Sequence, residues 1–174
     1  GCKINNYYSF NENTMGYVSF SSGYKSGGFS FATWSESESR GGFKEEELDA
    51  TEIGVKYKSP DNKFLVNAAF YEYDYTDQQQ QIIVTTASGS LAGKTFNAGQ
   101  SEMTGWELET KYAITDNTQI DFNYYSTDTV FKSFVIPQAR PPLSFTGNQM
   151  NYSPESAYNV AFTAVSNDES SVLR

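Results

Sequence analysis

Two carboxylates, Glu107 and Glu109, have the type and spacing that could support catalysis. On a strand, side chains two positions apart share a face and lie roughly 6.5 to 7 Å from each other. This separation falls within the range that an inverting glycosidase needs for its acid and its base. Paired acids on a strand are ordinary, however, and nothing in the sequence implies a cleft around this pair. We therefore expect no enzyme activity.

The composition removes the other common catalytic sites. The chain of 174 residues contains no histidine and a single cysteine, Cys2. A Ser-His-Asp or Cys-His site cannot form within it, and neither can a metal site with histidine ligands. One cysteine forms no internal disulfide. We expect neither a cofactor nor a metal site.

An acidic stretch from Glu36 to Asp49 leaves one alternative open for cations. It holds six carboxylates beside Arg40 and Lys44: Glu36, Glu38, Glu45, Glu46, Glu47 and Asp49. Carboxylate oxygens suit Ca²⁺, which could also bridge the stretch to lipopolysaccharide. The same composition is typical of a solvated loop, and this interpretation is favoured.

The charge balance indicates which partners the chain lacks. The sequence has 21 acidic and 12 basic residues, and its formal net charge is −9 at pH 7. Because proteins bind nucleic-acid phosphates with lysine and arginine, we expect no nucleic-acid partner.

The elements that must position these side chains are strands. Aromatic residues make up 16% of the chain, and Tyr, Phe, Thr and Ser favour strands over helices. No apolar run approaches the roughly 18 residues of a membrane-spanning helix. Polar and apolar residues alternate over about seven stretches, at 3–10, 15–25, 51–58, 64–75, 104–113, 119–127 and 158–165. Residues 82–86 also have strand propensity and could extend above the main sheet.

The connections between these strands alternate in length. Short turns are expected at 11–14, 59–63 and 115–118, where Asn, Asp and Pro supply turn chemistry. Long excursions are expected at 26–49, about 78–99 and 129–150. Short turns at one end and long loops at the other are typical of outer-membrane barrels. Seven strands do not close such a barrel, so we predict an all-β, antiparallel up-and-down meander that is a partial section of a large transmembrane β-barrel.

Four motifs, in the family's own order, resemble the barrel of TonB-dependent outer-membrane receptors. The first is Gly23-Tyr24-Lys25-Ser26-Gly27-Gly28-Phe29, after an aromatic strand. The second joins Phe43-Lys44-Glu45-Glu46, with Glu45 where proline is usual, to Glu52-Ile53-Gly54-Val55-Lys56. The third joins Ala68-Ala69-Phe70-Tyr71 to Asp74-Tyr75-Thr76-Asp77-Gln78. The fourth joins Asn97-Ala98-Gly99 to Gly105-Trp106-Glu107-Leu108-Glu109. The resemblance covers residues 15–113 well and the rest loosely.

This resemblance implies a 22-stranded barrel filled by a plug domain. Residues 1–174 would all belong to the barrel domain, and the plug would lie outside this chain. Such receptors sit in the outer membrane of Gram-negative bacteria and import scarce nutrients (ferric siderophores, haem, cobalamin or glycans) with energy from TonB. The implied partners are outer-membrane lipid and lipopolysaccharide, TonB through the missing plug region, and a small-molecule or metal-chelate substrate.

In a barrel the two faces of each strand have different surroundings, because one meets lipid and the other the lumen. The side chains expected to face lipid are Ile53, Val55, Tyr57, Trp106, Leu108, Tyr112, Ile120, Phe122 and Tyr124. The charged side chains expected to face the lumen, where they avoid the cost of burial in hydrocarbon, are Glu52, Lys56, Lys58, Glu107, Glu109, Lys111 and Asp121. Pairing between neighbouring strands could satisfy some of these charges.

Substrate recognition in the resembling family uses aromatic and basic residues of loops and plug. By position alone, the loop candidates here are Lys25, Phe29, Trp34, Arg40 and Arg140. Tyr24 and Phe29 could equally pack at strand ends.

Two other functions stay open at this point. A passive porin-like channel shares every topological feature named above. A soluble, secreted β-sandwich that binds glycans or adheres to surfaces would use the same alternation to build a core between two sheets.

Overall fold

The computed structural model describes residues 1–30, 42–85, 89–97, 99–136, 141–165 and 172–173. This part of the chain is built from strands and contains no helix long and apolar enough to cross a membrane.

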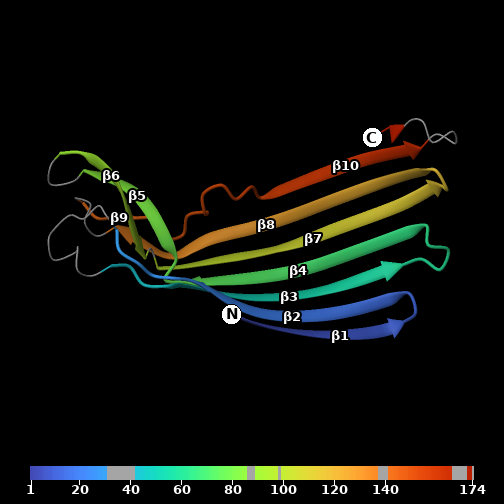
Figure 1. Ribbon diagram of the computed structural model, residues 1–174, viewed down its shortest axis with the longest axis horizontal. Coiled ribbons are helices and arrows are strands. Elements are labelled where there is room, and N and C mark those ends of the chain that lie inside the picture. The colour runs from blue at the N-terminus through green and yellow to red at the C-terminus, as the bar shows by residue number, and fades with distance from the viewer. Residues whose placement is uncertain (31–41, 86–88, 98, 137–140, 166–171, 174) are drawn as a thin grey trace.

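Antiparallel strands lie side by side in one large sheet (Figure 1). Its long strands, in spatial order, are β1 (Cys2–Asn11), β2 (Thr14–Lys25), β3 (Glu46–Lys58), β4 (Phe64–Thr76), β7 (Gly99–Thr115), β8 (Thr118–Ile136) and β10 (Ser156–Val165). Two short strands extend this sheet: β9 (Leu143–Ser144) pairs with β8, and β11 (Val172–Leu173) pairs with β10. A separate hairpin consists of β5 (Gln79–Thr85) and β6 (Leu91–Asn97). The all-β meander predicted from the sequence is confirmed.

The short turns lie at one end of the sheet, and the long connections, with β5, β6 and β9, lie at the other (Figure 1). We call these the turn end and the loop end. Three strands run further toward the loop end than the sequence predicted, since β3 begins at Glu46, β7 begins at Gly99 and β8 continues to Ile136. The excursion predicted to begin at residue 129 was therefore wrong in its first eight residues. The hairpin strand β6 was not predicted.

The extension of β8 has a packing cause. Phe131, Phe134 and Ile136 are at most 8% exposed and form the core of the loop end. Their neighbours come from β5, β6 and the segment after β9, and are Ile82, Phe96, Phe145 and Met150. Backbone bonds bind that segment to β8, since Phe131 donates to Asn148 and Gly147 donates to Phe131. An apolar core therefore holds the loop end together beyond the main sheet.

The turns at the other end are fixed by short polar side chains, as the sequence predicted. Between β1 and β2, the side chain of Asn11 accepts a bond from the backbone N–H of Asn13 at 2.8 Å. Between β3 and β4, the Ser59 hydroxyl donates to Asp61 at 2.5 Å, and the backbone N–H of Lys63 donates to the same carboxylate at 3.2 Å. Asn62 takes a left-handed φ of 60° in this turn. Both bonds stabilise the ionised carboxylate, so the pKa of Asp61 is lower than usual, chiefly because of the Ser59 hydroxyl.

A first prediction concerns this turn. Asp61→Ala should lower the urea midpoint of the barrel at neutral pH, because it removes both bonds. A carboxylate whose pKa is lowered by folding contributes stability above its unfolded pKa of about 3.9 and loses it as the pH falls through the lower folded value. The difference in urea midpoint between the native protein and Asp61→Ala should therefore become smaller in acid. A difference in urea midpoint that stayed the same down to about pH 2 would contradict this assignment of the bonds.

The large sheet exposes apolar side chains on one face and partly buries polar ones on the other, which is the reverse of a soluble protein. On β3, Ile53 is 54% exposed and Val55 is 39% exposed, whereas Glu52 and Gly54 on the other face are half-buried. We call the face that carries Ile53 the apolar face and the face that carries Glu52 the polar face. The apolar side chains of this face are exposed, whereas the β-sandwich alternative requires them to be buried in a core between two sheets.

The apolar face carries a band close to the height of a membrane. Four successive cross-strand rows on it are mainly apolar: Phe64–Tyr112–Ile120–Phe162, Tyr57–Val66–Thr110–Phe122–Val160, Gly16–Val55–Ala68–Leu108–Tyr124–Tyr158 and Val18–Ile53–Phe70–Trp106. A fifth row is apolar on β1 and β2, as Ile4–Phe20, and continues on the next strands as Thr51–Glu72–Thr104–Asp128. Rows two residues apart on strands tilted by about 40° rise about 5 Å each, so four rows cover about 20 Å and the fifth extends the band to about 25 Å on β1 and β2. The apolar band of an outer-membrane barrel is about 25 Å tall.

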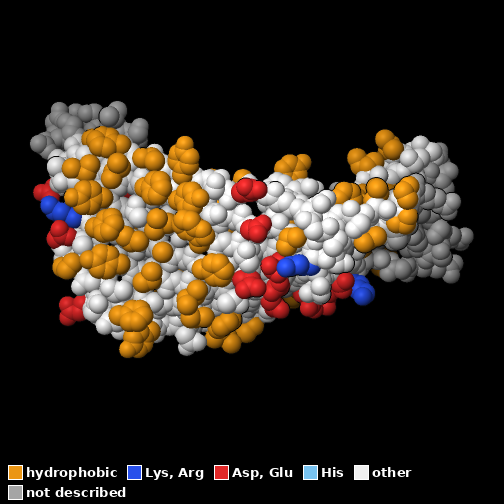
Figure 2. Space-filling model, turned by 180° about the vertical axis from the view of Figure 1, so that it is seen from behind, with side chains coloured by type: hydrophobic (Ala, Val, Ile, Leu, Met, Phe, Trp, Pro, Cys, Tyr) orange, Lys and Arg blue, Asp and Glu red, His pale blue; other side chains and the backbone are white. Residues whose placement is uncertain are grey.

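Beyond the four apolar rows, the same face becomes acidic toward the loop end. Glu72 and Asp128 lie in the fifth row, and Asp49, Asp74 and Glu102 lie in the row after it. Figure 2 shows apolar side chains gathered over the turn-end part of the molecule and acidic side chains between that part and the loop end. The apolar band therefore ends abruptly at a belt of carboxylates.

Candidate functional site

The loops at the loop end are joined by two amide side chains. Asn97 of β6 accepts a bond from the backbone N–H of Lys44 at 2.7 Å and donates to the carbonyls of Lys44 and Asp77 at 3.1 and 2.6 Å. Gln79 of β5 donates to the carbonyls of Ser26 and Lys44 at 3.0 and 3.1 Å. Its backbone N–H donates to the Glu46 carboxylate at 2.7 Å. We call Gln79, Asn97 and these partners the loop clasp.

Glycines make this clasp possible. A Cβ on Gly27 would collide with the backbone of Phe43 and Glu45, and a Cβ on Gly99 would collide with the carbonyl of Ser133. Gly99 also has a φ of +114°, which side chains rarely allow. The chain can approach so closely at these points because these residues lack side chains.

The polar face carries a network of tyrosines and acids. The Tyr17 hydroxyl donates to the Glu52 carboxylate at 2.5 Å, and the Lys56 ammonium lies 5.6 Å from the centre of the Tyr17 ring. Further across the sheet, the hydroxyls of Tyr71 and Thr127 share a buried hydrogen bond. The rings of Tyr71 and Tyr73 lie 5.0 Å apart. The polar face is therefore lined by phenol groups as well as by charges.

Two motif glycines lie directly beneath these tyrosines. A Cβ on Gly54 would enter the ring of Tyr17 on the neighbouring strand. A Cβ on Gly105 would meet both the Tyr71 hydroxyl and the backbone carbonyl of Ser126. Each glycine thus provides the space in which a tyrosine from the next strand lies flat against the sheet.

The seven charges expected to face the lumen lie together on the polar face, as their register shows. Several have neutral hydrogen-bond partners. Besides the Tyr17 bond to Glu52, the Asn67 amide donates to Glu109 at 3.2 Å and the Gln119 amide donates to Asp121 at 2.6 Å. Glu107 and Glu109 are neighbours along the same strand, β7. That these side chains face a lumen stays a prediction at this point.

The loop candidates are only partly placed. Lys25 ends β2 opposite Glu46 and is exposed, and Phe29 is 73% exposed. Trp34, Arg40 and Arg140 lie outside the described residues. The structure brings together the motif residues Gly27, Gly28, Asn97 and Gly99 at the loop clasp, where Gly28 pairs with Phe43.

The sequence did not predict two features of this region. Gln79 belongs to the glutamine-rich segment, but its partners are as much as 54 residues away. The carboxylates of Glu72, Asp74 and Glu102 lie within 4.8 Å of one another on the apolar face. Glu102 is paired with Lys132 at 2.8 Å. In the acidic stretch, Glu46, Glu47 and Asp49 are part of β3, whereas Glu36 and Glu38 lie outside the described residues.

Comparisons with known proteins agree with this geometry. Residues 3–168 match a family model described as TonB-dependent receptor-like, β-barrel. Among solved structures, the chain is similar to the ferric yersiniabactin uptake receptor of Yersinia pestis, with a TM-score of 0.72 and 19% identity over 98% of this chain and 23% of the receptor. It is also similar to the ferric-catecholate import receptor of E. coli K12, with a TM-score of 0.65 and 19% identity over 95% of this chain and 22% of the receptor.

A third similar structure is the ferripyoverdine receptor of the outer membrane of Pseudomonas aeruginosa, with a TM-score of 0.64 and 14% identity over 93% of this chain and 20% of the receptor. The chain thus spans less than a quarter of the length of each of these three receptors. At these identities the likeness establishes the fold alone.

Proposed function

Because the chain belongs to the TonB-dependent receptor-like β-barrel family, we propose that it is a section of an outer-membrane receptor that imports a ferric siderophore. The observation that supports this proposal most is the match of residues 3–168 to the barrel of that family. The similar solved structures are receptors for ferric yersiniabactin, ferric catecholates and ferripyoverdine. A ferric siderophore is therefore the favoured class among the nutrients that the family resemblance implied.

In this proposal the apolar face contacts lipid and the polar face lines the lumen around a plug supplied by the rest of the receptor. The apolar band of about 20 to 25 Å supports the first assignment. The polar face supports the second, since Glu52, Lys56, Glu107 and Tyr17 would be costly in hydrocarbon. The hydroxyls, amides and charges of that face can bond with a polar plug or with a polar substrate in transit.

The loop clasp would shape the extracellular entrance. It joins the loop after β2, the start of β3 and the β5–β6 hairpin, so their exposed side chains keep fixed relative positions. Lys25 and Phe29 lie at this end and remain candidate contacts for the substrate. A fixed entrance costs less ordering entropy on binding than a mobile one.

Uptake of iron tests the proposal. Cells that carry the full-length receptor should take up radioactive iron from at least one ferric siderophore, and deletion of the receptor gene or of tonB should abolish that uptake. Uptake that continued without TonB would favour the passive porin-like channel. A receptor that neither bound nor transported any ferric siderophore would show that the substrate class is wrong.

A second prediction concerns Asn97. Asn97→Ala removes three hydrogen bonds of the clasp, each worth about 0.5 to 1.5 kcal/mol. We expect the siderophore dissociation constant of the purified receptor to rise about tenfold, which corresponds to about 1.4 kcal/mol, because the loops lose their fixed arrangement.

Two variants serve as controls. Asn97→Asp keeps the acceptor for Lys44 and should have an intermediate effect. Asn5→Ala, on β1 outside the clasp, is the matched control and should bind normally. If Asn97→Ala and the native receptor bound the siderophore equally well, the clasp would not contribute to substrate binding.

A further inference from the structure

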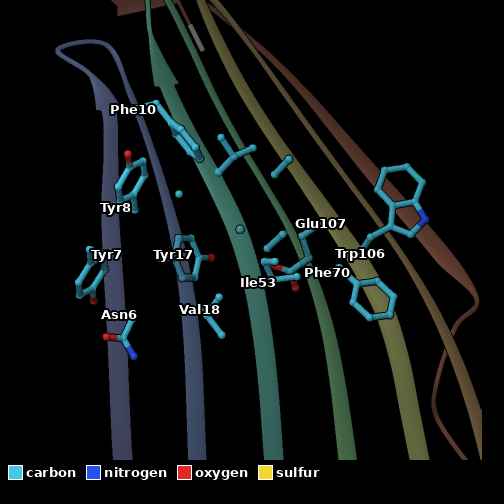
Figure 3. Close-up of a pocket in the computed structure, with 15 residues that line it drawn as sticks. Asn6, Tyr7, Tyr8, Phe10, Tyr17, Val18, Ile53, Phe70, Trp106 and Glu107 are labelled. Carbon is cyan, nitrogen blue, oxygen red and sulfur yellow. The ribbon is translucent and has the colours of Figure 1, made fainter.

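The apolar face contains a groove that its function as a plain lipid-contacting surface does not require. The groove has a volume of about 860 Å³, and its exposed lining is almost wholly apolar. Figure 3 shows it between Tyr8 and Phe10 on β1 and Phe70 and Trp106 on β4 and β7.

The floor of the groove is built from small residues placed in one row. Gly16, Val55 and Ala68 are direct cross-strand neighbours on β2, β3 and β4. A Cβ on Gly16 would lie 3.0 Å from the Phe10 ring, so the absence of a side chain there lets Phe10 lean over the floor. Low side chains in the middle and tall aromatic side chains on both sides make a channel along the sheet.

Ring contacts hold the walls of the channel. Tyr8 and Phe10 meet edge to face at 5.0 Å. On the opposite side, the Trp106 indole packs against Tyr124 at 4.8 Å. Aromatic pairs of this kind are worth about 0.5 to 1.5 kcal/mol beyond their buried area, so they favour the upright position of both walls. The groove is therefore largely formed before anything enters it.

The position of the groove identifies the occupant. It lies within the four apolar rows and is continuous with the surface that contacts lipid in a barrel of this fold. A protein segment would bring backbone N–H and C=O groups into hydrocarbon, where each unsatisfied group costs several kcal/mol. An alkyl chain brings none, and it fits a channel with smooth aromatic walls.

The charges around the groove indicate the side from which the chain enters. Toward the loop end, Glu72, Asp74 and Glu102 lie on the same face and would repel a phosphate group. At the turn end the groove reaches Phe10, beside the β1–β2 turn, which carries one carboxylate, Glu12, against the three at the loop end. We propose that this groove binds one acyl chain of a phospholipid from the leaflet at the turn end, which is the periplasmic side in this fold.

This proposal depends on insertion of the barrel in the membrane and not on the imported substrate. The test is native mass spectrometry of the full-length receptor, purified in mild detergent and mixed with a phospholipid of defined chain length. The native receptor should retain one phospholipid per barrel after detergent exchange. Ala68→Phe, which fills the floor, should reduce the retained fraction about tenfold, equivalent to about 1.4 kcal/mol of binding. Val160→Phe, on the same face but on β10 outside the groove, should retain the lipid like the native receptor.

Further arms separate the possible outcomes. Trp106→Ala removes one wall and should also lose the lipid, so the proposal remains testable if Ala68→Phe does not assemble. A heat-dependent shift of mobility in gels checks that each variant is a folded barrel. Retention that is equal in Ala68→Phe and Val160→Phe, binding of lipopolysaccharide in place of phospholipid, or a dimer without bound lipid would each overturn the proposal.

Discussion

Gly54→Val is expected to lower the free energy of unfolding of the barrel by about 3 kcal/mol or more, because the added methyl groups would occupy the space of the Tyr17 ring. Tyr17 cannot turn away without a cost. Its hydroxyl is bonded to Glu52, and Lys56 lies against its ring. The loss can be measured by urea titration of the purified receptor and by the amount of folded barrel in the outer membrane.

A double-mutant cycle identifies the source of this effect. At Gly54 the nearest atoms are all from the Tyr17 side chain, so Tyr17→Ala should restore much of the stability that Gly54→Val loses. At Gly105 the nearest atoms include the Ser126 carbonyl of the neighbouring strand as well as the Tyr71 hydroxyl. Tyr71→Ala should therefore fail to rescue Gly105→Val. Both glycines belong to the sequence motifs, but removal of the neighbouring tyrosine should restore stability only at Gly54.

Gly23→Ala is the matched control for both glycines. No atom lies within 4 Å of the position that its Cβ would take, and its φ lies outside the left-handed region. This variant should be as stable as the native receptor or slightly more so, because alanine reduces the entropy of the unfolded chain. If Gly23→Ala destabilised the receptor as much as Gly54→Ala, general strand flexibility and not the tyrosine contact would explain the glycines.

Leu108→Lys is expected to destabilise the inserted barrel by about 2 to 4 kcal/mol, the cost of a lysine near the middle of the bilayer on the lipid side. Leu108 is half-buried and lies in one of the two middle rows of the four apolar rows, between Ala68 and Tyr124. The measurement is the unfolding free energy in lipid vesicles, compared with that in detergent. The effect should be larger in the bilayer, where an ammonium group has less access to water.

Glu109→Lys is the control for the assignment of the faces. It introduces the same side chain one position further along β7, on the polar face next to Asn67. Because that face lines the lumen in our proposal, this variant should cost less than about 1 kcal/mol in vesicles, the usual size of a surface charge effect. If the two variants lost equal unfolding free energy, or if Glu109→Lys lost more, the two faces would be assigned the wrong way round.

Seen together, the motif residues have three different physical functions. Gly54 and Gly105 make room for tyrosines on the polar face. Asn97 and Gly99 belong to the loop clasp, one as a hydrogen-bonding group and the other as a backbone conformation. Glu52 accepts the hydrogen bond of Tyr17. A resemblance of sequence therefore corresponds here to a set of close contacts between neighbouring strands.

The sequence alone was sufficient for the existence of the seven long strands of the main sheet, the short turns and the separation of the two faces. These features depend on local chemistry. The alternation along 51–58 places Ile53 and Glu52 on opposite sides whatever the partner strand is. Asn13 and Asp61 form their turns through residues within five positions of themselves. Even the lengths of the connections, which indicated a membrane barrel, are a property of the chain and not of its packing.

Contacts between distant residues were decided by the tertiary structure. Asn97 binds Lys44 across 53 residues, and Tyr17 binds Glu52 across 35. The continuation of β8 to Ile136 depends on burial of Phe131 and Phe134 by the β5–β6 hairpin and the segment around Phe145. The physical reason is register. A shift of one residue between two strands would exchange the faces and every cross-strand neighbour, and the register follows from the fit of all the strands together, which no single stretch of sequence contains.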